Sequence, residues 1–229
     1  MVALAVFAKA PVPGRVKTRL IPPLTPVEAA RIARACLEES LRRFVPAAEG
    51  ATASLYLDGD VDDSLLALCG SLDVPVVPQS VGDLGARLRS AFRAARSGGA
   101  SKVLAIGSDS PTLDPARIRE AIEALDTSDI VLGPTEDGGY YLIGTRRDAD
   151  GIFDGIPWST PNVARATLAR AAALGLSVQQ LPAWYDLDDV ASLRRARDDA
   201  GDQVSALTRT IDSVLTARTR TSASSRSSC

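Results

Sequence analysis

The chain has 229 residues, of which 45% are hydrophobic and 24% are charged, and its formal net charge at pH 7 is −2. This size predicts one domain, or at most two, with a sizeable buried core, and the balanced charge excludes a global basic surface for nucleic acid or anionic lipid. The chain has no histidine, which excludes every mechanism that needs a histidine base or ligand and leaves only a hard cation on oxygen ligands as a metal (Mg²⁺, Mn²⁺ or Ca²⁺).

Apolar runs that predict strands alternate with segments that predict helices along most of the chain. Residues 2–8 form a continuous apolar run that ends at a loop with proline and glycine, as a buried strand does. At Thr25, an N-cap, a first-turn proline and an acid begin a helix that reaches about Phe44. The remaining elements expected are, in chain order, a strand over 51–57, a helix over 64–69, a strand over 74–77, a helix over 82–96, a strand over 102–107, a helix from its cap Asp114 to about Leu125, strands over 130–133 and 140–144, a helix over 161–174, a strand over 177–181 and a helix over 189–197.

This alternation predicts an α/β fold in which helices cover both faces of a mostly parallel sheet. The two strands that bracket residues 134–139 look antiparallel, so we expect a mixed sheet. Residues 1–200 should form one domain. Residues 201–229 lose the pattern and end in a serine-rich stretch, which predicts a largely disordered tail.

The sequence carries no signal for export or for a membrane. Cys36, Cys69 and Cys229 lack the spacing of a metal site and indicate a reducing compartment. The apolar N-terminus has no basic region before it and stops at Lys9, unlike a signal peptide. No apolar run approaches the roughly 18 residues that span a bilayer. We therefore expect a cytoplasmic protein that binds neither membrane nor nucleic acid.

The loop after the first strand is rich in cations. It holds two of the three lysines of a chain with 23 arginines, and lysine offers a compact point charge that suits a phosphate. In an open α/β sheet this loop commonly holds the phosphates of a ligand, although no Walker sequence is present. A solvated basic loop is the alternative. The predicted nucleotide site comprises Lys9, Gly14, Arg15, Lys17, Thr18 and Arg19, with Gly82 and Asp83 at the third helix and Ser108 and Asp109 after the fourth strand.

Carboxylates follow two of the predicted strands. Asp109 comes directly after an apolar strand and is free to bind metal, because Asp114 already caps the next helix. Asp186 and Asp188 point to one side of an extended segment, and Asp189 caps the last core helix. Such carboxylates on separate loops suit a Mg²⁺–nucleotide complex. The sequence predicts Asp109, Asp186 and Asp188 as ligands of Mg²⁺ or Mn²⁺; ordinary turn and cap residues are the alternative.

The turn before the sixth predicted strand offers a catalytic base. Without histidine, a base for an acceptor hydroxyl must be a carboxylate, and Glu136 or Asp137 is the natural candidate. A plain hairpin would explain the same turn without any function. Aromatic residues are only 4% of the chain, yet several lie near the candidate loops, where core packing is the alternative to stacking on a substrate. The predicted acceptor site comprises Gly138, Gly139, Tyr140, Trp158, Ser159 and Thr160.

One combination of segments is specific: residues 7–9 through 19–20, Gln79 with 82–85 and Arg87, 107–111, 133–144, 158–160 and 185–188. Together these segments resemble one bacterial family. It is the DUF2064 family, or radical-SAM/selenodomain-associated transferase 1, within the nucleotide-diphospho-sugar transferase superfamily. The resemblance covers about residues 2–198 and implies a single GT-A-like domain. The pattern of related nucleotidyltransferases is broken where Asp189 replaces a Thr and Ser192 replaces the last Asp.

The resemblance implies a nucleotide-linked substrate. We predict a glycosyltransferase that uses a nucleotide-sugar donor, Mg²⁺ or Mn²⁺ and a small-molecule acceptor. The basic loop also looks like that of nucleotidyltransferases such as the phospholactate guanylyltransferase of deazaflavin-coenzyme synthesis, so transfer from a nucleoside triphosphate (NTP) to a phosphorylated small molecule is the alternative. A non-catalytic nucleotide-binding module is a further alternative, against which the combination of loop cations with Asp109 argues. The predicted catalytic residues are Lys17, Asp109, Glu136 and Asp137.

Overall fold

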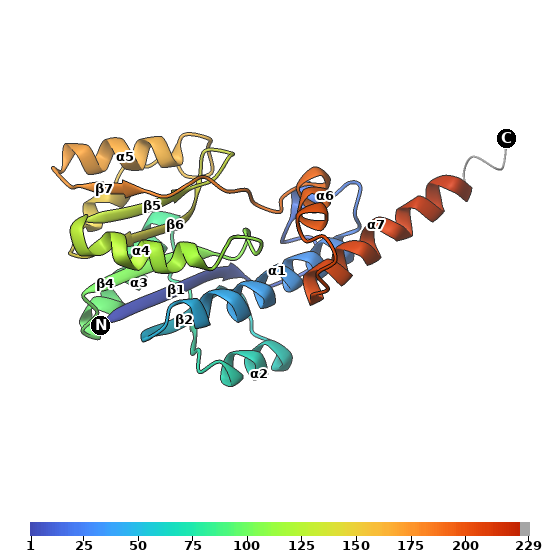
Figure 1. Cartoon of the computed structure of the whole chain (residues 1–229), viewed down its shortest axis with the longest axis horizontal. Coiled ribbons are helices and arrows are strands. Elements are labelled where there is room, and N and C mark those ends of the chain that lie inside the picture. Colours follow the sequence, from blue (N-terminus) through green and yellow to red (C-terminus); the bar gives the residue numbers. More distant parts are fainter. Residues whose placement is uncertain (225–229) are drawn as a thin grey trace.

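A computed structural model of the chain describes the backbone of residues 1–224 and the side chains of residues 1–216 (Figure 1). Its seven strands form a single sheet in the order β3-β2-β1-β4-β6-β5-β7. All neighbouring pairs are parallel except those of β6, which runs antiparallel to both β4 and β5. The strands are β1 (Val2–Lys9), β2 (Ala51–Asp58), β3 (Val76–Pro78), β4 (Lys102–Gly107), β5 (Ile130–Pro134), β6 (Tyr140–Thr145) and β7 (Val178–Gln180).

Helices cover both faces of this sheet, as the alternating pattern predicts. One apolar core lies between the sheet and α1, α2 and α4, and a second lies between the other face and α3, α5 and the short helix η2. The predicted mixed, mostly parallel α/β sheet is confirmed. The helices are η1 (Thr18–Leu20), α1 (Pro26–Ala47), α2 (Asp63–Ser71), α3 (Leu84–Ser97), α4 (Ala116–Thr127), η2 (Asp150–Phe153), α5 (Val163–Ala173), α6 (Val190–Asp199) and α7 (Ala206–Ser224).

Local caps explain where the helices beside the site begin. Thr25 and Glu28 form a capping box at the start of α1: the Glu28 N–H donates to Thr25 Oγ1, and the Thr25 N–H donates to the Glu28 carboxylate at 2.8 Å. Asp189 caps α6 by accepting from the Ser192 N–H at 2.7 Å. Both caps were expected, because they depend on residues three positions apart.

The C-terminal segment differs from the prediction. We expected residues 201–229 to be largely disordered, but residues 206–224 form α7, which packs on α1 and α6 at one end of the molecule (Figure 1). Leu207, Ile211 and Val214 recur at helical spacing and are buried. This stripe is a weak signal because serine, threonine and arginine surround it. Residues 225–229 of the predicted tail lie outside the described part of the chain.

A third apolar core lies beyond the end of the sheet. It joins η1 and the first half of α1 to α6 and α7, and includes Leu20, Leu187 and Ile211, all 0% exposed. Two charged segments of the candidate site flank this core, the loop before η1 and the segment before α6. Within the described residues, no helix is both long and apolar enough to cross a membrane.

Candidate active site

A cavity of about 650 Å³ opens where the loops leave β1 and β4. These two central strands are neighbours, and in open α/β sheets ligands bind at the carboxyl ends of such strands. A smaller cavity of about 340 Å³ adjoins it and shares Arg19, Tyr140, Trp158 and Asp186 with it. The predicted nucleotide-site residues that line the larger cavity are Lys9, Arg15, Lys17, Thr18, Arg19, Gly82, Asp83, Ser108 and Asp109.

Lys17 is the most buried cation of the loop. Its side chain is only 4% exposed, and its backbone adopts the left-handed conformation, with φ 47°. The Nζ atom forms an ion pair with Asp109 and lies 3.1 Å from Asp188 Oδ1. Burial acts to lower the pKa of Lys17, but these carboxylates outweigh it and raise the pKa above its ordinary value, so Lys17 is charged. Lys17 is therefore not a solvated surface cation, which was the alternative to a binding role for this loop.

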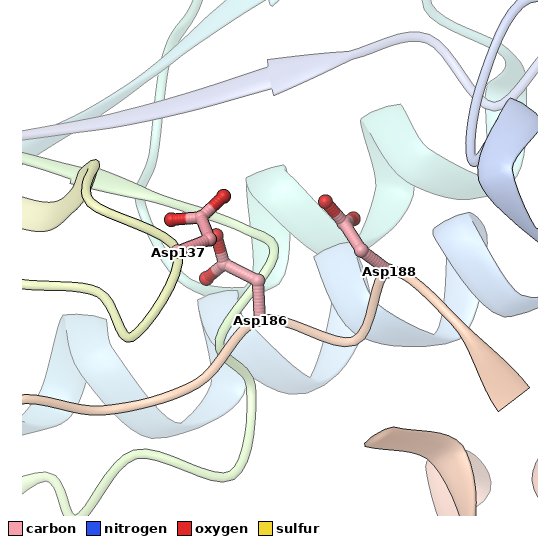
Figure 2. A group of neighbouring side chains, drawn as sticks. All are labelled: Asp137, Asp186 and Asp188. Atoms are coloured by element: carbon pink, nitrogen blue, oxygen red, sulfur yellow. The ribbon is translucent and has the colours of Figure 1, made fainter. Parts of the chain in front are cut away.

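Three carboxylates meet beside this lysine. Asp137 comes from the turn between β5 and β6, and Asp186 and Asp188 come from the segment before α6 (Figure 2). One oxygen of each lies within 4.8 Å of the corresponding oxygens of the other two. The sequence predicted Asp109 as the partner of Asp186 and Asp188, but the structure places Asp137 in this group and pairs Asp109 with Lys17.

The charges of these acids depend on their neighbours. Burial, together with the nearby charge of Asp109, raises the pKa of Asp186 to about 6, against a hydrogen bond that the Ser110 hydroxyl donates to Asp186. Desolvation inside the cavity likewise acts to raise the pKa of Asp109, whose side chain is 56% exposed, but the Lys17 ammonium beside it holds this pKa below its ordinary value. The paired acid is therefore ionised, while Asp186 can change its charge near neutral pH.

The segment before α6 is extended, so its side chains alternate between two sides. Tyr185 and Leu187 are buried in the third core, whereas Asp186 and Asp188 line the larger cavity. The Leu187 N–H donates to the Asp109 carbonyl at 2.8 Å, which ties the segment to the loop after β4. The predicted common direction of the two aspartates is confirmed.

Only one of the two predicted bases faces a cavity. Asp137 lines the smaller cavity. Glu136 lines neither cavity, because its carboxylate binds Arg195 of α6, with Nη1 2.9 and 3.0 Å from the two oxygens. Of the two residues predicted as the base, the structure therefore brings Asp137 to a cavity and not Glu136.

Most of the predicted acceptor residues surround the smaller cavity. The rings of Tyr140 and Trp158 meet edge to face, with centroids 6.4 Å apart. Gly138 does not line the cavity: its φ is 91°, and a Cβ atom there would lie 2.0 Å from the Pro161 carbonyl oxygen. A glycine is needed at position 138 because its backbone approaches that of Pro161 closely. The predicted acceptor residues that line the smaller cavity are Gly139, Tyr140, Trp158, Ser159 and Thr160. Gly14, which was predicted as part of the nucleotide site, also lines neither cavity. Its backbone has a φ of 78°, and it forms part of a turn.

Three residues that line the larger cavity and bind one another were not among the predicted site residues: Asp58, Gln79 and Arg87. Arg87 donates to Asp58 Oδ2 at 2.7 Å and to Gln79 Oε1 at 2.9 Å. The Gln79 amide in turn donates to the carbonyls of Ala8 and Tyr56. Asp58 is the last residue of β2. A charged residue at the carboxyl end of a predicted strand was the sequence signal that could have identified it as a site residue.

The chain matches the model of one protein family over residues 42–160, described as "Uncharacterized protein conserved in bacteria (DUF2064)". None of the curated proteins matches it. Among solved structures, it is similar to a proposed nucleotide-diphospho-sugar transferase from Desulfovibrio desulfuricans G20, at 29% identity and a TM-score of 0.83. The similarity covers 93% of this chain and 94% of that chain.

More distant structures share the fold alone. A nucleotidyl transferase from Methanothermobacter is 18% identical, with a TM-score of 0.57 over 87% of this chain and 97% of that one. Glucosyl-3-phosphoglycerate synthase from Mycobacterium tuberculosis, in complex with Mn²⁺ and uridine diphosphate, is 13% identical, with a TM-score of 0.50 over 81% and 70%. The predicted GT-A-like fold is confirmed.

Proposed function

We propose that this chain, which belongs to the bacterial DUF2064 family, is a glycosyltransferase that moves a sugar from a nucleotide to a hydroxyl group of a small acceptor. The observation that carries this choice is the charge of the smaller cavity. Of the described residues that line it, Arg19 is the only cation, whereas Asp137 and Asp186 are acidic. If Asp186 binds the divalent cation proposed below, Asp137 remains as a carboxylate that can take the proton of an acceptor hydroxyl, and Arg19 is the one cationic side chain among these residues for an acceptor phosphate.

Asp137 is the base in this proposal. Its Oδ1 accepts hydrogen bonds from Thr135 Oγ1 at 2.6 Å and from the Gly139 N–H at 3.1 Å, which orient the carboxylate. The same side chain lies within 4.8 Å of the Asp186 and Asp188 ligand atoms. A hydroxyl held by Asp137 would thus lie beside Asp186 and Asp188, where we place the cation and the diphosphate below. Direct displacement of the diphosphate by the hydroxyl requires this proximity.

The larger cavity holds the nucleotide in this proposal. Lys9, Arg15, Lys17 and Arg19 line it and supply positive charge for the phosphates. The nucleobase would lie at the ends of β1 and β2. There Asp58, which is held by Arg87, can accept a hydrogen bond from an N–H group of the nucleobase.

The carboxylates suit a divalent cation. Asp186 and Asp188 would hold it together with phosphate oxygens, because Mg²⁺ commonly takes one or two protein carboxylates and completes its shell with substrate and water. An all-oxygen donor set in a chain without histidine fits Mg²⁺ or Mn²⁺. Such a cation would neutralise charge on the leaving diphosphate. Lys17, which is charged and lines the same cavity, would add to that stabilisation.

One observation favours nucleotidyl transfer as a second candidate. Four cations of a single loop line the larger cavity, which is enough positive charge for a triphosphate. In that reaction an already ionised acceptor phosphate attacks the α-phosphorus, pyrophosphate leaves, and no base is needed.

The two reactions release different products. The purified protein should be incubated with Mg²⁺ or Mn²⁺ and a small-molecule cell extract, with nucleotide-sugars in one set of reactions and NTPs in another. Release of a nucleoside diphosphate from a sugar donor would support glycosyl transfer, and pyrophosphate from a triphosphate would support the second candidate. If neither product forms above the level of the Asp186→Asn variant, the transferase proposal is wrong.

A further inference from the structure

We propose that Glu136, Arg195 and Tyr185 form a clamp that sets the separation between the carboxylates of Asp137 and Asp186. Glu136 directly precedes Asp137, and Tyr185 directly precedes Asp186. These three are positioning residues, because none of them lines the cavities. The inference rests on the function proposed above, in which Asp137 and Asp186 work side by side.

One arginine contacts both neighbours of the carboxylates. Arg195 Nη1 lies 3.0 and 2.9 Å from the two oxygens of Glu136. The guanidinium carbon lies 3.8 Å from the centroid of the Tyr185 ring, within the range of a cation–π contact. The Tyr185 hydroxyl donates to Asp199 Oδ2 at 2.7 Å, which fixes the ring against α6. Arg195 is therefore held between the β5–β6 turn and the segment before α6.

The backbone alone leaves these two segments weakly joined. The Glu136 N–H donates to the Trp184 carbonyl at 2.9 Å, and the Trp184 N–H donates to the Pro134 carbonyl at 3.1 Å. Past that point, no backbone hydrogen bond among the described residues joins Asp137 to the segment of Asp186. Arg195 adds a side-chain contact that joins Glu136 to Tyr185, the two residues that directly precede the carboxylates.

The clamp acts on position more than on overall stability. The Glu136 and Arg195 side chains are 52% and 45% exposed, and a pair this exposed contributes little to the free energy of unfolding. A displacement of one catalytic group by about 1 Å, by contrast, can lower a rate on the order of a hundredfold. Loss of the clamp should therefore disturb the site before it disturbs the fold.

The same helix supplies a matched control. Arg197 donates to Asp212 of α7 at 2.7 Å and touches neither of the two segments. Arg195→Met keeps an apolar contact on the Tyr185 ring but removes the charge and the Glu136 contact. Arg197→Met removes a comparable ion pair elsewhere on α6. Glu136→Gln tests the other end of the clamp.

Hydrogen–deuterium exchange of the intact, ligand-free protein tests the clamp directly. Arg195→Met should raise exchange about fivefold in peptides over both 135–141 and 184–189, at a melting temperature close to that of Arg197→Met. Glu136→Gln should act in the same direction, and Arg197→Met should change neither peptide. Unchanged exchange in both peptides of Arg195→Met would overturn the clamp, as would an equal rise in Arg197→Met.

A second measurement connects the clamp to the proposed function. Titration with Mn²⁺ should show an affinity several-fold weaker in Arg195→Met than in Arg197→Met, because Asp186 would shift relative to Asp188, the other proposed ligand, once Tyr185 loses its contact with the arginine. Wild-type protein that binds no Mn²⁺ would count against the proposed function, while the exchange data would still decide the clamp. Mn²⁺ binding equal in both variants, beside a rise in exchange confined to the 135–141 peptide, would also overturn it.

Discussion

Lys17 Nζ lies 3.1 Å from Asp188 Oδ1, although the two residues are 171 positions apart in the chain. The contact closes the loop after β1 onto the segment before α6, and the same nitrogen pairs with Asp109. A single buried ammonium thus balances carboxylates from two loops. A phosphate that binds Lys17 therefore competes with Asp109 and Asp188 for the ammonium group.

Replacement of Lys17 should weaken nucleotide binding. Lys17→Met keeps most of the side-chain volume but removes the charge, so the dissociation constant of a nucleoside diphosphate should rise by about tenfold or more, as for a lost charge-assisted hydrogen bond. Isothermal titration at fixed Mg²⁺ measures it. Lys102→Met is the control, because Lys102 lies at the opposite end of β4 and binds the Ile122 carbonyl. Equal affinities in the two variants would refute a phosphate role for Lys17.

Asp186 should make the stability of the metal-free protein depend on pH. Its pKa is raised from an ordinary 3.8 to about 6. The folded state therefore keeps this proton to higher pH than the unfolded state does, and the stability it contributes is lost as the pH rises from about 4 to 6. Relative to Asp186→Asn, the wild type should lose about 2 kcal/mol of unfolding free energy between pH 4 and pH 7.

Urea denaturation in EDTA at a series of pH values measures this difference. Asparagine keeps the shape and can still accept the Ser110 hydrogen bond. Parallel pH profiles for the two proteins would show that Asp186 titrates normally.

Asp137 and Asp186 should separate into different roles. Asp137→Asn should lower turnover at saturating donor by about a hundredfold or more, as for loss of a general base, and leave Mn²⁺ and donor affinities near wild type. Asp186→Asn should weaken Mn²⁺ binding itself. Turnover and Mn²⁺ titration together make the comparison. If Asp137→Asn loses Mn²⁺ as severely as Asp186→Asn, Asp137 is a third ligand and not the base.

Helix α7 should be essential to the fold. Ile211 is 0% exposed in the third core, so Ile211→Ala should lower the free energy of unfolding by about 2–4 kcal/mol. Val204→Ala, at a position that is 71% exposed, should have almost no effect. Denaturant unfolding of both variants checks the prediction. Similar small losses in both would indicate that the segment from residue 201 adds little to the fold, as the disordered tail predicted from the sequence would.

Patterns among residues close together in the chain were sufficient to predict the strands, two helix caps and the direction of two site aspartates. The apolar runs predicted every strand of the sheet, because burial requires them whatever the order of the strands. Thr25 and Asp189 were predicted as caps from residues within one turn of helix, and the alternation along 185–188 predicted that Asp186 and Asp188 share a side. The absence of histidine limited any metal site to oxygen ligands before the fold was known.

The choice between adjacent or equivalent acids was decided only by tertiary contacts. Glu136 and Asp137 are indistinguishable as sequence candidates, but Arg195, 59 residues away, binds Glu136 and leaves Asp137 at the cavity. Asp109 likewise pairs with Lys17, whose charge it meets only because β1 and β4 are neighbours in the sheet. Ion pairs depend on distance in space, and no local pattern records that distance. The sequence therefore determined which chemical groups the site contains, and the fold determined which of them face one another.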